Sequence, residues 1–160
     1  MATYKRFEDL PVWQDALELM VVVDRLSGDQ IFQRKRSYQD QLERATLSIS
    51  NNIAEGFERG TTKELLMFLY IARGSAGEVR SMTLVFERLP DFSHLKLQIT
   101  DLRSWVESVS RQIRAWADQL QNSDLTGQRY INEASKKSRQ QQEQRLVFEE
   151  YLKSFVNKQR

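Results

Sequence analysis

The chain has 160 residues, of which 40% are hydrophobic and 29% charged, with a formal net charge of +2. This composition is typical of one domain with a hydrophobic core. The absence of cysteine excludes disulfides, thiolate metal sites and cysteine nucleophiles, and His94 is the only imidazole available for a triad or a metal site.

No apolar run approaches the roughly 20 residues that span a bilayer, and the start, MATYKRFEDL, lacks the apolar core of a signal peptide. We therefore expect a cytoplasmic protein that has no membrane contact, no metal and no cofactor.

Charge is distributed unevenly along the chain. Residues 1–121 contain 16 basic and 17 acidic side chains, whereas residues 122–160 contain 8 basic and 5 acidic ones. The slightly basic character therefore comes from the tail, and a nearly neutral body is not typical of a surface that binds nucleic acid everywhere.

The first expected helix starts at Pro11, because proline suits the first helical turn, and it stops at Gly28. Five of its residues keep helical spacing: Trp13, Ala16, Leu17, Met20 and Asp24. Residues 29–36 are expected to form a connection that ends in the basic run Arg34, Lys35 and Arg36.

The second expected helix covers residues 37–58 and contains the stretch RATLSISNNIAEGFERG. At 3.6 residues per turn it has an apolar side, made of Leu42, Ala45, Ile49, Ile53, Gly56 and Phe57. A neighbouring side is polar but has mostly short side chains: Arg44, Ser48, Asn51, Asn52 and Glu55. Ser and Asn compete with the helix backbone for hydrogen bonds, so three of them on one side in mid-helix are unfavourable for a merely solvated face. This pattern predicts a packed polar contact with another helix, another subunit or a ligand.

The third expected helix starts at a capping box formed by Thr61 and Glu64, and continues to about residue 89, before Pro90. Its core side is predicted to contain Leu65, Phe68, Leu69, Ala72, Ala76, Val79, Thr83 and Phe86. A second apolar side carries Met67, Ile71, Gly74, Glu78 and Val85, with Tyr70 and Leu66 close by. A helix that is apolar on most sides is normally buried on most sides. We therefore predict an oligomer interface at Met67, Ile71, Gly74 and Glu78; the alternative is a tightly packed monomer core.

The fourth expected helix begins near Ser93, and its apolar residues alternate by three and four up to Leu120. Such a heptad pattern predicts near-parallel packing against neighbouring helices. The fold class is thus predicted as all-α, an antiparallel up-down four-helix bundle of residues 1–121. Residues 122–160 are predicted to be a polar, basic extension that ends in a short amphipathic helix, docked on its own oligomer or on a partner. The apolar residues of that helix are Leu146, Phe148, Tyr151, Leu152, Phe155 and Val156.

Two stretches, RATLSISNNIAEGFERG and FLYIARGSAGE, resemble the signature of the four-helix bundle proteins encoded within intervening sequences of bacterial 23S ribosomal RNA genes. The accessory variability proteins of diversity-generating retroelements belong to the same superfamily, and the resemblance covers residues 7–120. It implies a ring-like homopentamer with a non-enzymatic accessory role. In the retroelement branch it also implies a basic barrel that binds nucleic acid and a reverse transcriptase. The matching motif residues are Arg44, Ser48, Asn52, Ile53, Ala54, Glu55, Gly56, Arg59, Arg73, Gly74, Ser75 and Glu78.

Three functional hypotheses follow. The favoured one is an oligomeric accessory protein that binds RNA or DNA phosphates, and possible contacts are Arg34, Lys35, Arg36, Arg73, Arg80, Arg103, Arg111 and Arg114. The second is a ring-shaped protein-docking scaffold without nucleic acid, in which these arginines are solvated or form intersubunit ion pairs. Under either hypothesis, Arg44, Ser48, Asn52 and Glu55 are predicted to form a polar network. An enzyme that uses Glu55 and Glu78 as paired carboxylates is the least favoured hypothesis.

Overall fold

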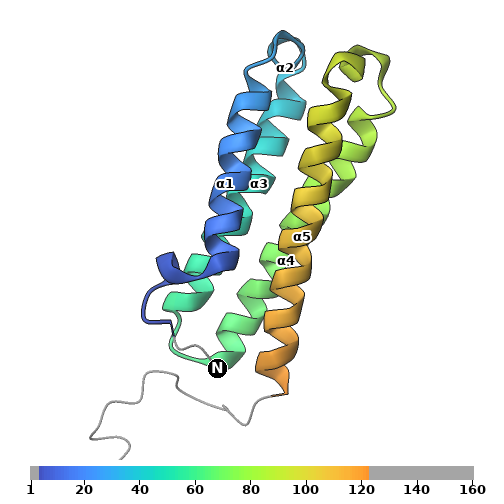
Figure 1. Cartoon of the computed structure of the whole chain (residues 1–160). Coiled ribbons are helices and arrows are strands. Elements are labelled where there is room, and N and C mark those ends of the chain that lie inside the picture. The colour runs from blue at the N-terminus through green and yellow to red at the C-terminus, as the bar shows by residue number, and fades with distance from the viewer. Residues whose placement is uncertain (1–3, 123–160) are drawn as a thin grey trace, which may run out of the picture. The chain divides into compact units, whose positions relative to one another are not determined.

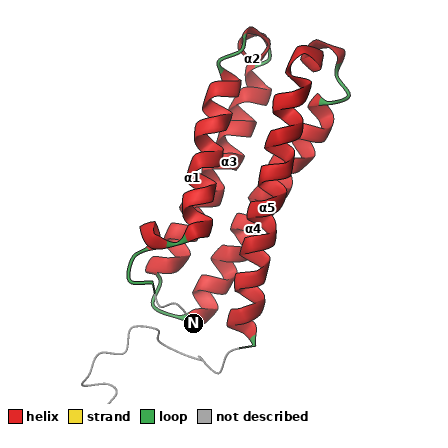
Figure 2. Ribbon diagram, viewed as in Figure 1, coloured by secondary structure: helices red, strands yellow, loops and turns green. Residues whose placement is uncertain are grey.

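The computed structural model describes residues 4–122, which belong to the first of the two units into which the chain divides, Met1–Gly127. Four long helices make up most of this part: α1 (Pro11–Ser27), α3 (Arg36–Glu58), α4 (Thr62–Phe86) and α5 (Lys96–Gln121). Three short elements complete it: η1 (Phe7–Asp9), α2 (Gln30–Arg34) and η2 (Pro90–Leu95). Every element of the described part is helical (Figures 1 and 2).

Successive long helices run in opposite directions and stand side by side, which confirms the predicted antiparallel up-down four-helix bundle (Figure 1). α3 packs on α1 and α4, and α5 packs on α4 and α1. α1 and α4 therefore occupy diagonal corners of the bundle. The predicted extension and its terminal helix lie outside the described residues, so the domain boundary at residue 121 stays a prediction.

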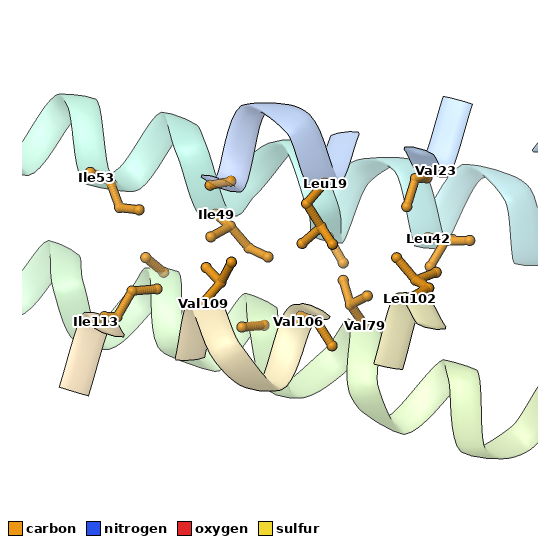
Figure 3. Close-up of a cluster of buried hydrophobic side chains, with 14 of the residues drawn as sticks. Leu19, Val23, Leu42, Ile49, Ile53, Val79, Leu102, Val106, Val109 and Ile113 are labelled. Atoms are coloured by element: carbon orange, nitrogen blue, oxygen red, sulfur yellow. The ribbon is translucent and has the colours of Figure 1, made fainter. Parts of the chain in front are cut away.

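Aliphatic side chains from all four long helices fill the core (Figure 3). Leu19 of α1, Ile49 of α3, Val79 of α4 and Val106 of α5 are fully buried. At the end of the bundle that contains α2, the core becomes aromatic. Its rings come from different elements: Phe32, Tyr38, Phe86 and Phe92. The burial of these side chains is the main favourable term in folding.

The residues of α1 that were singled out for their helical spacing are not its buried side. Leu17 and Asp24 are exposed, and Trp13 and Met20 are only partly buried. The side that faces the core consists instead of Val12, Ala16, Leu19, Val23 and Leu26. The stretch from Ala16 to Val23 is apolar at every position except Glu18, so its periodicity does not single out one side.

Three helix assignments also differ from the prediction. The expected connection at residues 29–36 contains α2, which begins where the Asp29 carboxylate accepts a hydrogen bond from the Ile31 backbone N–H at 2.9 Å. A helix of five residues is too short for its apolar spacing to be recognised. α4 ends at Phe86, three residues before the predicted end, and η2 precedes α5 where the sequence predicted the start of the fourth helix.

Candidate interaction surface of α3 and α4

The short polar residues of α3 and α4 form a continuous chain of hydrogen bonds between the two helices. The Asn52 side-chain amide donates to the Ser48 hydroxyl at 2.9 Å and to the Ser48 carbonyl at 2.7 Å. The Ser48 and Ser75 hydroxyls lie 2.9 Å apart, and Ser75 donates to the carbonyl of Ile71 at 3.2 Å. Each hydroxyl thus accepts one hydrogen bond and donates another, an arrangement in which neighbouring bonds strengthen one another.

α3 and α4 approach each other closely at Gly56. A Cβ atom there would lie 2.7 Å from the Cβ of Phe68 and 3.2 Å from Cδ1 of Leu65. Both distances are shorter than an ordinary van der Waals contact, so Gly56 is the residue that allows α4 to lie against this turn of α3.

The predicted polar network is only partly assembled within the chain. The structure brings Ser48 and Asn52 together, and Ser75 joins them as a residue that the sequence analysis did not place in this network. Arg44 is exposed and makes no side-chain hydrogen bond or ion pair with any described residue. Glu55 is exposed and pairs with Arg59 at 2.6 Å instead. The signal for Ser75 was present in the sequence, because it is a polar residue within the buried side of α4.

Glu55 and Glu78 do not form a pair of carboxylates. Glu78 lies beside Gln41, with 3.4 Å between the amide nitrogen and the carboxylate oxygen. Gln41 and Glu55 are separated by 14 residues of the same helix, which corresponds to about 20 Å along its axis. The geometry therefore contradicts the hypothesis that the two carboxylates share one site.

The outer side of α4 exposes a row of apolar side chains. Met67, Tyr70, Ile71 and Val85 are all exposed, and Met67 presents 53% of its surface. Gly74 and Gly77 lie between them, and a Cβ added at either glycine would meet no atom within 4 Å. We call Met67, Tyr70, Ile71, Gly74, Gly77 and Val85 the α4 patch. Three of the four predicted interface residues lie in it, and the fourth, Glu78, is exposed one helical turn after Gly74.

Nothing within the described part of the chain explains the two glycines. Each glycine in a helix interior costs up to about 1 kcal/mol relative to alanine. At Gly56 this cost is offset by the close approach of α4, whereas Gly74 and Gly77 face open space. The chain therefore gives up stability at the α4 patch without an internal contact that requires glycine there.

The eight predicted nucleic-acid contacts are not equally available. Lys35 pairs with Asp91 at 3.2 Å, Arg103 with Glu87 at 2.7 Å, and Arg114 more loosely with Asp118 at 3.6 Å. The other five form no ion pair with a described residue: Arg34, Arg36, Arg73, Arg80 and Arg111. The pairing of Arg103 with Glu87 had no signal in the sequence, because Arg103 lies on α5 and Glu87 is the residue that follows α4.

A polar depression lies at the α2 end of the bundle and is lined by Asp29, Arg34, Lys35, Asp91 and His94. The Nε2 atom of His94 is 3.1 Å from the Asp29 carboxylate. The Ile31 backbone N–H and, to a smaller extent, His94 lower the pKa of Asp29, because both interactions favour the charged carboxylate. Acidic and basic groups alternate here, so the depression has no dominant charge for a ligand.

Residues 4–122 contain neither a candidate metal site nor a candidate membrane-spanning helix. No cluster of three or more His, Cys, Asp or Glu side chains has the geometry to hold a metal ion. None of the helices in this range is long and apolar enough to cross a membrane.

A comparison with protein families found a match that covers most of the described residues. The family model described as 23S rRNA-intervening sequence protein matches residues 8–115. No curated protein matches the chain. The matched residues include the whole of α1, α3 and α4, with both halves of the Asn52–Ser48–Ser75 chain. This protein is therefore a member of the 23S rRNA-intervening sequence protein family.

Proposed function

We propose that this protein is a homo-oligomeric accessory protein whose subunits associate through the α4 patch. The observation that carries the proposal is the row of exposed apolar side chains on a helix whose opposite side is already in the core. Apolar area that is exposed in a single chain becomes favourable when a second surface covers it. Gly74 and Gly77 support the proposal, because a helix without side chains at these positions admits the close approach of another backbone.

The resemblance to the accessory variability proteins of diversity-generating retroelements supports a closed ring of five subunits. It also supports a reverse transcriptase as a partner of that ring. The alternative within the same proposal is a ring-shaped protein-docking scaffold that does not bind nucleic acid.

The test of self-association is the mass of the full chain in solution, measured by light scattering after size exclusion. We expect the wild-type protein to have a multiple of the 18.9 kDa mass of one chain. Ile71→Glu places a charge in the α4 patch and should give single chains. Leu97→Glu is the matched control, because Leu97 is 72% exposed on α5, outside the α4 patch. A wild-type protein of 18.9 kDa at every concentration would contradict the proposal.

Nucleic-acid binding is the second candidate function, and the charge of α4 and α5 favours it. These two helices contain seven basic and five acidic side chains. Arg73, Arg80 and Arg111 form no ion pair with a described carboxylate, so they are available to phosphates. Contacts of this kind are independent of sequence and weaken steeply as salt rises.

The test of this candidate is the binding of a single-stranded RNA at low and at moderate salt. We expect Arg73→Gln with Arg80→Gln to weaken binding and to reduce its salt dependence, whereas Lys35→Gln should change little because Lys35 is paired with Asp91. A wild-type protein that assembles but does not bind RNA at low salt would favour the protein-docking scaffold.

A further inference from the structure

A second exposed apolar patch lies on the other side of the bundle, on α1 and α3. Leu17, Val21 and Leu47 are exposed, with 42%, 37% and 46% of their surfaces accessible. A polar groove between α1 and α3 is lined by Asp24 on α1 and by Asp40 and Glu43 on α3, together with Arg36.

Helical spacing places these three apolar residues next to that groove. Leu47 lies one turn after Glu43 on α3, and Val21 and Leu17 lie one and two turns before Asp24 on α1. Because α1 and α3 are antiparallel, both steps lead away from the groove in the same direction along the bundle. Leu17, Val21 and Leu47 therefore gather on the outer side of this helix pair, and we call them the α1–α3 patch.

The helix pairs that carry the two patches differ in net charge. α1 and α3 together contain three basic and seven acidic side chains, whereas α4 and α5 contain seven basic and five acidic ones. An apolar centre in acidic surroundings complements an apolar centre in basic surroundings, and like surfaces of either kind repel each other. The charges therefore favour contact between unlike patches over contact of either patch with itself.

We infer that the α4 patch of one subunit packs on the α1–α3 patch of the next, so that the interface joins two different surfaces in a head-to-tail manner. The occupant of the α1–α3 patch is thus a second copy of this chain. α1 and α4 lie at diagonal corners of the bundle, so each subunit can use both patches at once. Head-to-tail contacts generate rings or filaments, whereas contact of a patch with its own copy stops at a dimer. This inference rests on the proposed self-association and adds which surface covers the α4 patch.

The test uses two variants of the full chain, each with one damaged patch. Ile71→Glu damages only the α4 patch, and Leu47→Glu damages only the α1–α3 patch. We expect each variant alone to have the mass of one chain. An equimolar mixture should give a species of two chains, because the intact α1–α3 patch of the first variant fits the intact α4 patch of the second.

Other outcomes separate this inference from the proposed function. If the wild-type protein assembles and Leu47→Glu assembles equally well, the head-to-tail contact is wrong while self-association stands. If both variants are single chains and their mixture stays at the mass of one chain, the inference is also overturned. A wild-type protein that is itself a single chain would instead contradict the proposed function.

Two controls accompany the mixing experiment. Leu97→Glu should assemble as the wild type does, because Leu97 belongs to neither patch. Far-ultraviolet circular dichroism should show the helix content of the wild type for both variants. If Leu47→Glu fails this check, Leu17→Glu takes its place in the same patch.

Discussion

α4 and α5 are neighbouring helices of 25 and 26 residues that bury one side in the same core, but their outer sides differ. Leu97 is the one large hydrophobic residue that α5 exposes, whereas α4 exposes Met67, Tyr70, Ile71 and Val85. α5 has the ordinary pattern of a surface helix with one apolar stripe, and α4 carries a second stripe. The comparison teaches that the inner side of α4 serves the fold of one chain, and that its outer side needs a different explanation.

The largest expected effects come from the inner sides, where the two helices should behave alike. Leu69→Ala on α4 and Ile113→Ala on α5 each remove a fully buried side chain. We expect each to lower the free energy of unfolding by about 2–5 kcal/mol, through lost burial and the remaining cavity. Urea denaturation in the Ile71→Glu background measures this for single chains. A loss below about 1 kcal/mol at Leu69 would mean that α4 is not held by the core as described.

The glycines of α3 and α4 should respond in opposite directions to the same added methyl group. Gly56→Ala forces α3 away from Phe68 and should destabilise single chains by about 1–3 kcal/mol. Gly74→Ala meets no atom and should stabilise them by up to about 1 kcal/mol through higher helix propensity. Both are measured by urea denaturation in the Ile71→Glu background. A destabilising Gly74→Ala in that background would show that the outer side of α4 has an internal contact.

The hydroxyl chain between α3 and α4 should contribute less than the core. Ser75→Ala removes the link to Ser48 and should lower the free energy of unfolding by about 1 kcal/mol. Ser81→Ala is the matched control, because Ser81 is exposed on the same helix and should change stability by less than about 0.5 kcal/mol. Equal effects of the two substitutions in thermal unfolding would mean that the link does not stabilise the pair of helices.

The smallest expected effect concerns the contact of η2, which lies just before α5, with α2. α5 starts without a side-chain cap, whereas α4 starts at the Thr61–Glu64 capping box. Here His94, in η2, contacts the N-cap residue of α2, Asp29, whose pKa is lowered from its ordinary value of 3.8. The stabilisation by the charged carboxylate is therefore present above pH 3.8 and is lost as the pH falls through the folded-state pKa. Asp29→Ala should be less stable than the wild type at pH 7, and the difference should shrink at pH 3. Asp101→Ala, at an exposed position on α5, should show no such pH-dependent difference.

The sequence predicted the parts of the fold that repeat with a clear period. The apolar residues predicted for the inner side of α3 and most of those predicted for α4 are buried, because polar residues separate their apolar stripes. The buried Thr46 and Ser50 of α3 were not predicted. The residues singled out on α1 are not its buried side, since Leu17 and Leu19 are equally apolar and only packing decides which one is buried. Leu17 was therefore not identified from the sequence as an exposed residue of the α1–α3 patch.

The polar residues of α3 show a second limit of prediction from the sequence. The unusual Ser and Asn residues of α3 indicated a packed contact, but the partner of Ser48 depends on the register between α3 and α4. No local pattern encodes that register, because it follows from how two separate helices pack. Arg44 was grouped with Ser48 and Asn52 on the helical wheel, yet its long side chain extends into solvent beyond the hydroxyl chain.

The hydrogen-bonded link between Ser48 and Ser75 also acts as a marker of alignment along the bundle axis. A stripe of aliphatic side chains tolerates sliding, because one apolar contact replaces another. If α4 slid by one turn, Ile71 or Val79 would take the place of Ser75 beside Ser48, and neither has a hydroxyl. A slipped bundle would thus keep most of its hydrophobic contacts but leave Ser48 without its partner on α4. Ser48 and Ser75 thus distinguish the native alignment of α3 and α4 from an alignment that is shifted by one helical turn.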